Sequence, residues 1–342
     1  MKSFSFGALP DGRAVTAYAL NGPGGRAAVI LDYGCTIQSL LVPDRTGELR
    51  DVVLGYDTAA EYAQNSGFFG ACIGRVGNRI GNSQLPLNGK IYHLTPSEGP
   101  NQLHGGPEGF DRQLWRAEAQ DGRLVFTRTS PDGEGGYPGN LDVRVAYEWD
   151  GPALRITYDA VSDADTAVSL TNHSYFNLRG CSGDILGHTL RLDADGFTEI
   201  DSALLPTGRI LPVAGTPFDF TEAKPVGRDI AAGDAQLRLG GGYDHNFVLR
   251  PGEGIHPAAR LHCPESGIAL SVSTTAPAVQ LYTGNAITPR KGRGGMALGK
   301  HSGLCLETQI HPDAVHHPSF PSPILRAGAA YHSCTVYEFS AD

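Results

Sequence analysis

The chain has 342 residues, 36 of them acidic and 27 basic, and its formal net charge is −9. Lys and Arg form no cluster, which argues against nucleic acid or an anionic membrane as a partner and favours a neutral, polar small molecule. The N-terminal residues lack the apolar core of a signal peptide, and no apolar run reaches the ~18 residues of a membrane helix, so we expect a cytoplasmic protein. The six cysteines are scattered without a CxxC pair, as expected of reduced, buried thiols.

Short strands joined by turns are predicted along the whole chain. The 45 Gly and 23 Pro fall at short intervals, which is typical of this arrangement. In chain order, the expected strands span residues 27–31, 38–42, 123–129, 143–149, 154–161, 189–193, 246–250, 269–274, 279–283 and 335–339. The segment Asp150-Gly151-Pro152 separates two of these runs and predicts a hairpin.

Helical patterns are few. Residues 58–64 fit a short helix with Asp57 or Thr58 as the N-cap. The sequence therefore predicts an all-β protein built from large packed antiparallel sheets. Because no Gly/Ser linker, charge run or internal repeat divides the chain, we expect residues 1–342 to form a single domain.

Two ionisable residues lie inside strand-like runs. Alternate side chains of a strand face opposite sides, so Glu307 shares a polar face with Gln309 while leucines occupy the other face. By the same rule His173 shares its face with Tyr175. A carboxylate and an imidazole on polar strand faces suit acid–base chemistry on a hydroxylated substrate. The alternative is that both faces simply meet solvent.

Three Gly-containing segments supply further candidates. Residues 74–82 form either a turn with surface arginines or a turn that presents Asn78 and Arg79 to sugar hydroxyls; a phosphate loop is disfavoured because no strand–loop–helix context follows. In residues 101–110, His104 is either a surface residue or a ligand-facing one. In residues 241–249, Asp244 serves either turn formation or a strand face shared with Asn246.

His311, His316 and His317 suggest a metal cluster at first sight. Their spacing matches no compact zinc site, and several prolines make the segment a turn-rich loop. We therefore expect no metal to be bound there.

Six segments, in this order, resemble the motifs of the aldose 1-epimerase (galactose mutarotase) family: residues 74–80, 101–115, 131–139, 171–178, 243–248 and 307–322. The resemblance extends from Asp32 to Phe339. It implies a large, mostly antiparallel β-sandwich with an open sugar-binding cleft and no metal or organic cofactor. It also implies an isomerase that interconverts the α and β anomers of free aldoses such as galactose or glucose.

Site residues carried over from the family occupy matching motifs of this sequence. The resemblance implies that Glu307 is the general base and His173 the general acid. The positions that would hold the sugar are Asn78, Arg79, His104, Asp244 and Gln280, of which Gln280 is the weaker match. The candidates for an aromatic ring stacked on the sugar are Tyr175, Phe176 and Trp115.

The protonation state of the pair is a separate hypothesis. His173 must be protonated to act as an acid, although the reference pKa of histidine is ~6.5. We expect Asp244 and Glu307 to keep its proton by charge attraction.

Three alternatives remain open from the sequence. A hexose-6-phosphate 1-epimerase-like enzyme would need a cationic phosphate pocket, for which Arg75 and Arg79 are the only dense basic pair near a motif. A glycoside hydrolase or lyase would pair Asp244 with Glu307. A non-catalytic sugar-binding protein would share the fold without needing an acid–base pair. We expect a monosaccharide partner and a monomer or weak homodimer; the preferred aldose is not predicted.

Overall fold

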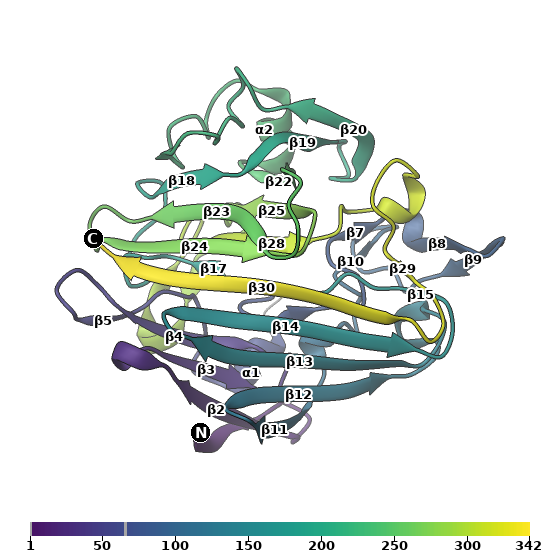
Figure 1. Cartoon of the computed structure of the whole chain (residues 1–342), viewed down its shortest axis with the longest axis horizontal. Coiled ribbons are helices and arrows are strands. Elements are labelled where there is room, and N and C mark those ends of the chain that lie inside the picture. The colour runs from purple at the N-terminus through teal and green to yellow at the C-terminus, as the bar shows by residue number, and fades with distance from the viewer. Residues whose placement is uncertain (1, 65–66) are drawn as a thin grey trace.

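The computed structural model describes residues 2–64 and 67–342. Its main layer is a nine-stranded antiparallel sheet whose long strands β12, β13, β14 and β30 lie side by side in Figure 1. In spatial order it comprises β11 (Arg116–Gln120), β12 (Arg123–Ser130), β13 (Leu141–Asp150), β14 (Ala153–Ser162), β30 (Ala330–Ala341), β24 (Ile268–Thr274), β23 (His256–His262), β18 (Thr189–Leu192) and β21 (Lys224–Pro225).

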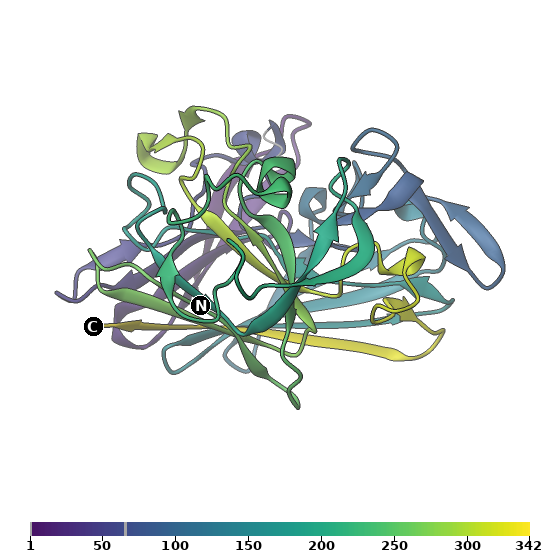
Figure 2. The same cartoon turned by 90° about the horizontal axis from the view of Figure 1, so that it is seen from above.

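Two smaller antiparallel sheets pack on one face of this layer. The six-stranded sheet comprises β17 (Tyr175–Phe176), β28 (Leu304–Gln309), β25 (Ala278–Tyr282), β22 (Asp244–Leu249), β19 (Ala194–Ile200) and β20 (Pro206–Pro212). The five-stranded sheet comprises β1 (Lys2–Ala8), β2 (Ala14–Asn21), β3 (Ala27–Leu31), β4 (Ile37–Pro43) and β5 (Leu49–Asp51). Figure 2 shows β30, in yellow, along one side of the molecule with most of the remaining strands on its other side.

Two-stranded ribbons and short helices complete the described part of the chain. The ribbons are β6 (Cys72–Ile73) with β16 (Thr171–Asn172), β7 (Arg79–Ile80) with β10 (Gln102–Leu103), β8 (Gln84–Leu87) with β9 (Lys90–His93), β15 (Thr166–Ala167) with β29 (Ile324–Leu325), and β26 (Arg290–Lys291) with β27 (Ala297–Leu298). The α-helices are α1 (Ala59–Gln64) and α2 (Ala235–Gly240). The 3₁₀ turns are η1 (Pro23–Gly25), η2 (Gly81–Ser83), η3 (Phe110–Arg112), η4 (Glu134–Gly136), η5 (Arg293–Gly295) and η6 (Ala314–His316). Within residues 2–64 and 67–342, no helix is long and apolar enough to span a membrane.

The core lies between the large sheet and the smaller ones. Leu154 and Ile156 alternate with more exposed residues along β14, so one face of this strand is apolar and buried. They belong to the same hydrophobic cluster as Leu304 and Leu306 of β28. The odd-numbered side chains of β28 must therefore point away from the main core.

The predicted all-β fold is confirmed. Each expected strand overlaps an observed one, and the hairpin at Gly151 joins β13 to β14 with Asp150 opposite Ala153. Helix α1 begins one residue after Thr58, whose Oγ1 accepts a hydrogen bond from Glu61 N, while Glu61 Oε2 accepts one from Thr58 N. Sequence reasoning missed α2, although an Asp234 N-cap and a left-handed Gly241 C-cap mark its ends.

Arg75 ties the segment 74–82 to the loop that follows β12. Its guanidinium is buried and donates hydrogen bonds to Ser130 Oγ, Thr166 Oγ1 and four backbone carbonyl oxygens, those of residues 130, 131, 138 and 139. Burial lowers the pKa of Arg75 to about 10, so the side chain stays charged at neutral pH. The interpretation of residues 74–82 as a turn with surface arginines is therefore wrong for Arg75, which is a structural residue.

Arg75→Leu should lower the free energy of unfolding by ~3–5 kcal/mol, because the substitution leaves several buried carbonyls without donors. Urea unfolding followed by far-UV circular dichroism measures this loss. Arg116→Leu is the matched control, since the Arg116 side chain is 79% exposed and its replacement should change stability by no more than ~0.5 kcal/mol. Equal losses in the two variants would contradict a structural role for Arg75.

Candidate functional site

A cleft of about 490 Å³ lies beside the six-stranded sheet. Most of the candidate residues line it: Asn78, Arg79, His104, His173, Asp244 and Glu307. These side chains come from segments far apart in the sequence. The fold therefore brings together the residues that sequence reasoning selected, with Gln280 directly behind them.

A larger hollow of about 850 Å³ lies over the outer part of β12, β13, β14 and β30. Its charged groups have partners of their own: for example, Asp159 contacts both Arg144 and His332. These side chains are partly or fully exposed, so water weakens the interactions between them. The smaller cleft, with its buried ionisable groups, is the better candidate for chemistry.

Glu307 projects from β28 into the cleft. Its neighbours Leu304 and Leu306 enter the main core, so strand alternation turns Glu307 to the opposite face, as predicted. That face does not meet bulk solvent, because Glu307 is only 2% exposed. Burial, and then the nearby Asp244 carboxylate, raise the pKa of Glu307 well above its usual range, although Arg79 opposes the shift. Its Oε2 atom has no hydrogen-bond partner among the described residues, so it is available to a ligand.

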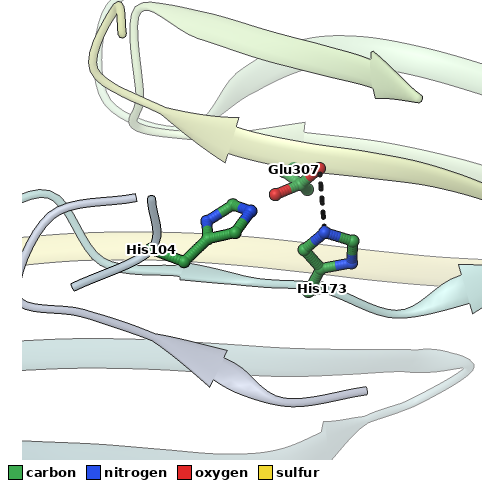
Figure 3. A group of neighbouring side chains, drawn as sticks. All are labelled: His104, His173 and Glu307. Atoms are coloured by element: carbon green, nitrogen blue, oxygen red, sulfur yellow. Dashed lines mark ion pairs between the residues drawn. The ribbon is translucent and has the colours of Figure 1, made fainter. Parts of the chain in front are cut away.

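His173 faces Glu307 from a break between two strands. The predicted continuous strand through this residue is wrong, because β16 pairs with β6 and ends at Asn172, whereas β17 pairs with β28 and begins at Tyr175. Its backbone bonds instead to Ala71 and Gly70. The Nε2 atom lies 3.7 Å from Glu307 Oε1, the contact drawn in Figure 3.

The expectation that His173 is held protonated is also contradicted. The imidazole is buried among aromatic rings, and this burial lowers the pKa of His173 to about 4. A charged imidazole would lose its hydration there, and the pKa of Glu307 is raised for the same reason. Burial thus favours the uncharged pair, with one proton on the carboxyl group.

His104 is held in one tautomer by a backbone contact. The N–H of Asn78 donates to His104 Nδ1 at 3.0 Å, so the neutral ring carries its proton on Nε2. His104 is buried, and burial, with a smaller contribution from the positive charge of Arg79, lowers its pKa well below the usual range, which keeps the ring neutral. We infer that His104 Nε2–H is a hydrogen-bond donor toward the cleft.

This tautomer decides how to interpret a possible metal site. Donor atoms of His104, His173 and Glu307 lie within 4.8 Å of one another (Figure 3). A metal ligand needs a free lone pair, yet His104 Nε2 carries a hydrogen as long as Asn78 N–H occupies Nδ1. The group therefore fits hydroxyl groups of a substrate better than a metal ion.

Within the described ranges, His311, His316 and His317 belong to no group of side chains that could bind a metal ion. The ring of His311 packs against Phe320, His316 contacts Asp313 at 2.6 Å, and His317 bonds to a backbone carbonyl. Asp313 also receives a hydrogen bond from Gly81 N at 2.9 Å. This segment supports the turn that follows Arg79.

Arg79 reaches the cleft from β7 and is almost completely buried. Its guanidinium forms a two-point ion pair with Glu98, with Nε–Oε2 at 2.5 Å and Nη2–Oε1 at 2.9 Å. Its backbone N–H donates a hydrogen bond to the side-chain oxygen of Asn78. The backbone of Asn78 has a positive φ of 61°, which Asn tolerates. Sequence reasoning missed Glu98, since nothing in its local pattern points to Arg79.

Asp244 stands at the start of β22 and is held by an amide. Gln280 Nε2 donates to Asp244 Oδ1 at 2.7 Å, so the weakest sequence match lies behind the cleft wall as a partner of Asp244. Gln309 Nε2 in turn donates to Asn246 Oδ1 at 3.0 Å and lies 3.5 Å from Gln280 Oε1. Strand alternation had placed Asn246 with Asp244 and Gln309 with Glu307, but it could not show that their amides connect.

The aromatic wall of the cleft differs from expectation. Tyr175 lines the cleft, whereas Phe176 packs on Tyr337 and Trp115 on Phe110, both inside the core. Phe68 and Tyr282 also line the cleft and were not predicted. Phe68 covers the His104 ring, with the two ring centroids 4.7 Å apart.

An NMR titration of His173 should give a pKa below 5, because burial disfavours the imidazolium. His332, whose side chain is 61% exposed and paired with Asp159, provides an internal comparison near a carboxylate at the surface. A His173 pKa above 6 would restore the hypothesis of a charged acid at rest.

The model of the aldose 1-epimerase family matches residues 16–338. Human galactose mutarotase is 45% identical over 338 residues, covering 98% of this chain and 97% of that protein. Aldose 1-epimerase of Escherichia coli K12 is 39% identical, with 97% of each chain covered. The solved structure of an aldose epimerase homologue from C. elegans superposes with a TM-score of 0.89 at 33% identity, covering 96% of this chain and 99% of the other. Galactose 1-epimerase from Lactobacillus acidophilus gives a TM-score of 0.87 at 29% identity, covering 99% and 98%. On the strength of the family match and these full-length relatives, the chain belongs to the aldose 1-epimerase family.

Proposed function

We propose that this protein interconverts the α and β anomers of a free aldose such as galactose or glucose. The observation that carries the proposal is the buried pair of Glu307 and His173, 3.7 Å apart in a cleft lined by hydrogen-bonding groups. No metal or organic cofactor enters the proposed chemistry. The catalytic pair and the sugar-binding residues are assignments of this proposal.

Anomerisation proceeds by opening and closing the sugar ring. The base removes the proton of the C1 hydroxyl while the acid protonates the ring oxygen, so that the C1–O5 bond breaks and a C1=O1 aldehyde forms. After rotation about C1–C2, the two groups exchange roles and the ring closes on the other face. Each positioned acid or base contributes ~10²–10⁴-fold.

We assign Glu307 as the base and His173 as the acid in ring opening. The uncharged pair holds one mobile proton, so moving it from Glu307 to His173 Nε2 creates this working state without a change in total charge. Sugar hydroxyls that donate to Glu307 Oε2, and the positive charge of Arg79, both favour the carboxylate. Substrate binding would thus prepare the acid and base for the reaction.

Anchors away from C1 must hold the rest of the sugar while the aldehyde rotates. Arg79 and His104 Nε2–H offer donors, and Asp244 offers acceptors. The ion pair with Glu98 and the amide of Gln280 fix two of these anchors before substrate arrives. Such preorganisation lowers the entropy cost of holding the sugar.

The alternatives lose support. A phosphate pocket would need free guanidinium groups at Arg75 and Arg79, but Arg75 donates to backbone carbonyls and Arg79 is paired with Glu98. A binding protein would have no need to keep Glu307 buried with an unpaired oxygen, which costs stability. A glycosidase would leave the adjacent His173 without a role.

We also infer that the chain acts as one domain, as a monomer or weak homodimer in the cytoplasm, on a monosaccharide. A single large cluster of buried side chains draws on all three main sheets, which supports one domain. The cysteines are free and buried, which suits a reducing compartment. Large exposed apolar side chains are scattered, among them Phe4, Ile91 and Ile210, which supports a weak rather than an obligate interface.

Glu307→Gln should slow the approach of freshly dissolved α-D-galactose or α-D-glucose to equilibrium rotation by ~10²-fold or more, because the amide cannot take up the C1 hydroxyl proton. Polarimetry measures the rate. The melting temperature should not fall, since the amide matches the buried carboxyl group in size and is also uncharged. Near-wild-type turnover in this variant would exclude Glu307 as the base.

Asp244→Asn should raise KM by roughly tenfold and change kcat less, because a charged hydrogen-bond acceptor to the sugar is worth ~1.5–3 kcal/mol. Initial rates over a range of galactose concentrations separate the two constants. Asp193→Asn is the control, because this carboxylate lies between β18 and β19, pairs with Arg250 and does not line the cleft. A loss confined to kcat would instead place Asp244 in the proton transfer.

A further inference from the structure

The imidazole of His173 lies between two side chains of the same strand. Its Nδ1 atom is 3.4 Å from Cys305 Sγ, and its Nε2 atom is 3.7 Å from Glu307 Oε1. Cys305 and Glu307 are two residues apart in β28, so their side chains share a face. The pairing of Tyr175 with Cys305 carries the preceding His173 to this position.

Among the described residues, the remaining neighbours of the ring are aromatic and offer Nδ1 no charged partner. Phe68 and Tyr175 pack against its faces, and the rings of His104 and Tyr282 approach edge-on. Among the side chains of the described residues, the Cys305 sulfur is the hydrogen-bond partner of Nδ1, and a hydrogen bond to the backbone of His173 itself also favours a proton on the ring. Both side chains are buried, so the geometry of this contact is protected from water.

A neutral imidazole carries one hydrogen, on either Nδ1 or Nε2. The nitrogen that faces Glu307 must be able both to accept and to release a proton if the acid and base exchange roles. It can do so only if the neutral ring keeps its hydrogen on Nδ1. That hydrogen then needs an acceptor, and the Cys305 sulfur is in place.

We propose that Cys305 is a positioning residue whose Sγ accepts a hydrogen bond from His173 Nδ1–H and so keeps Nε2 free to exchange the proton of the reaction. The inference rests on the catalytic role proposed for His173. Cys305 touches neither the sugar nor the reacting atoms in this scheme. It acts through the tautomer and the orientation of the imidazole.

A neutral thiol differs in its effect from the aspartate that orients histidine in serine proteases. That aspartate stabilises the imidazolium by its charge. Burial raises the pKa of Cys305 well above its usual range, so the group stays uncharged and orients the ring without making it more basic. A weakly basic His173 returns its proton readily, which suits a reaction run equally in both directions.

The tautomer can be observed directly by ¹⁵N NMR of protein labelled at histidine, at neutral pH. In the wild type, we expect His173 Nδ1 to carry the hydrogen and Nε2 to be bare. Cys305→Ser supplies a hydroxyl oxygen as acceptor and should keep this tautomer, with kcat within a few-fold of the wild type. Cys305→Ala removes the acceptor and should give mixed tautomers, with kcat lowered about tenfold and KM unchanged.

Cys263→Ala is the matched control for the loss of a buried thiol. Cys263 is equally inaccessible, follows β23 in the large sheet and belongs to the main core. Its replacement should leave both the His173 tautomer and kcat unchanged.

A wild-type His173 with its hydrogen on Nε2 would overturn the proposal, and so would a Cys305→Ala variant with unaltered tautomer and kcat. The wild-type spectrum and the serine variant decide the question even if the alanine variant folds poorly. If the His173 tautomer changes with substitution of Cys305 as expected, but the protein accelerates no mutarotation, the proposed function is refuted. The hydrogen bond between His173 and Cys305 is then still supported.

Discussion

The contact between Glu307 and His173 is the constraint on which the cleft depends. Two ionisable side chains lie 3.7 Å apart with almost no access to water. Desolvation would make two isolated charges costly there, so the uncharged forms are favoured, with one transferable proton on the carboxyl group. The unpaired Glu307 Oε2 still costs ~1–3 kcal/mol, a stability that the rest of the fold must supply.

The β-sandwich supplies this stability by burying one face of β28 in the apolar core while the other face forms the cleft. Leu304 and Leu306 join the main core, while Cys305, Glu307 and Gln309 face the cleft side. Strand register then sets which side chains neighbour the carboxylate, because Gln280 of β25 lies directly opposite Glu307, and Asn246 of β22 lies directly opposite Gln280. A slip of one residue in β28 would exchange its core and cleft side chains, so the apolar face that stabilises the sandwich also fixes the site.

Local pattern predicted the parts of this arrangement that depend on one strand. Alternation placed Glu307 opposite its leucine neighbours, and the expected strands overlap observed ones throughout the chain. It failed at His173, because the chain leaves one sheet and joins another there. Glu98 and Phe68 were missed for a related reason, since their importance comes from contacts with Arg79 and His104 that only the folded chain creates. The protonation of His173 was misjudged because attraction between charges can be inferred from residue types, whereas burial cannot.

The uncharged resting pair fits a reaction with no net change in charge or proton count. Ring opening takes one proton and delivers one, and ring closure does the same in reverse. A strongly charged acid at His173 would favour one direction of transfer, and a carboxylate beside Nδ1 would create such an acid. A buried thiol at that position orients the ring while leaving the energies of the two proton positions close. On this view the aromatic walls, the neutral Cys305 and the burial of Glu307 serve one requirement: an acid and a base that can exchange roles within a single turnover.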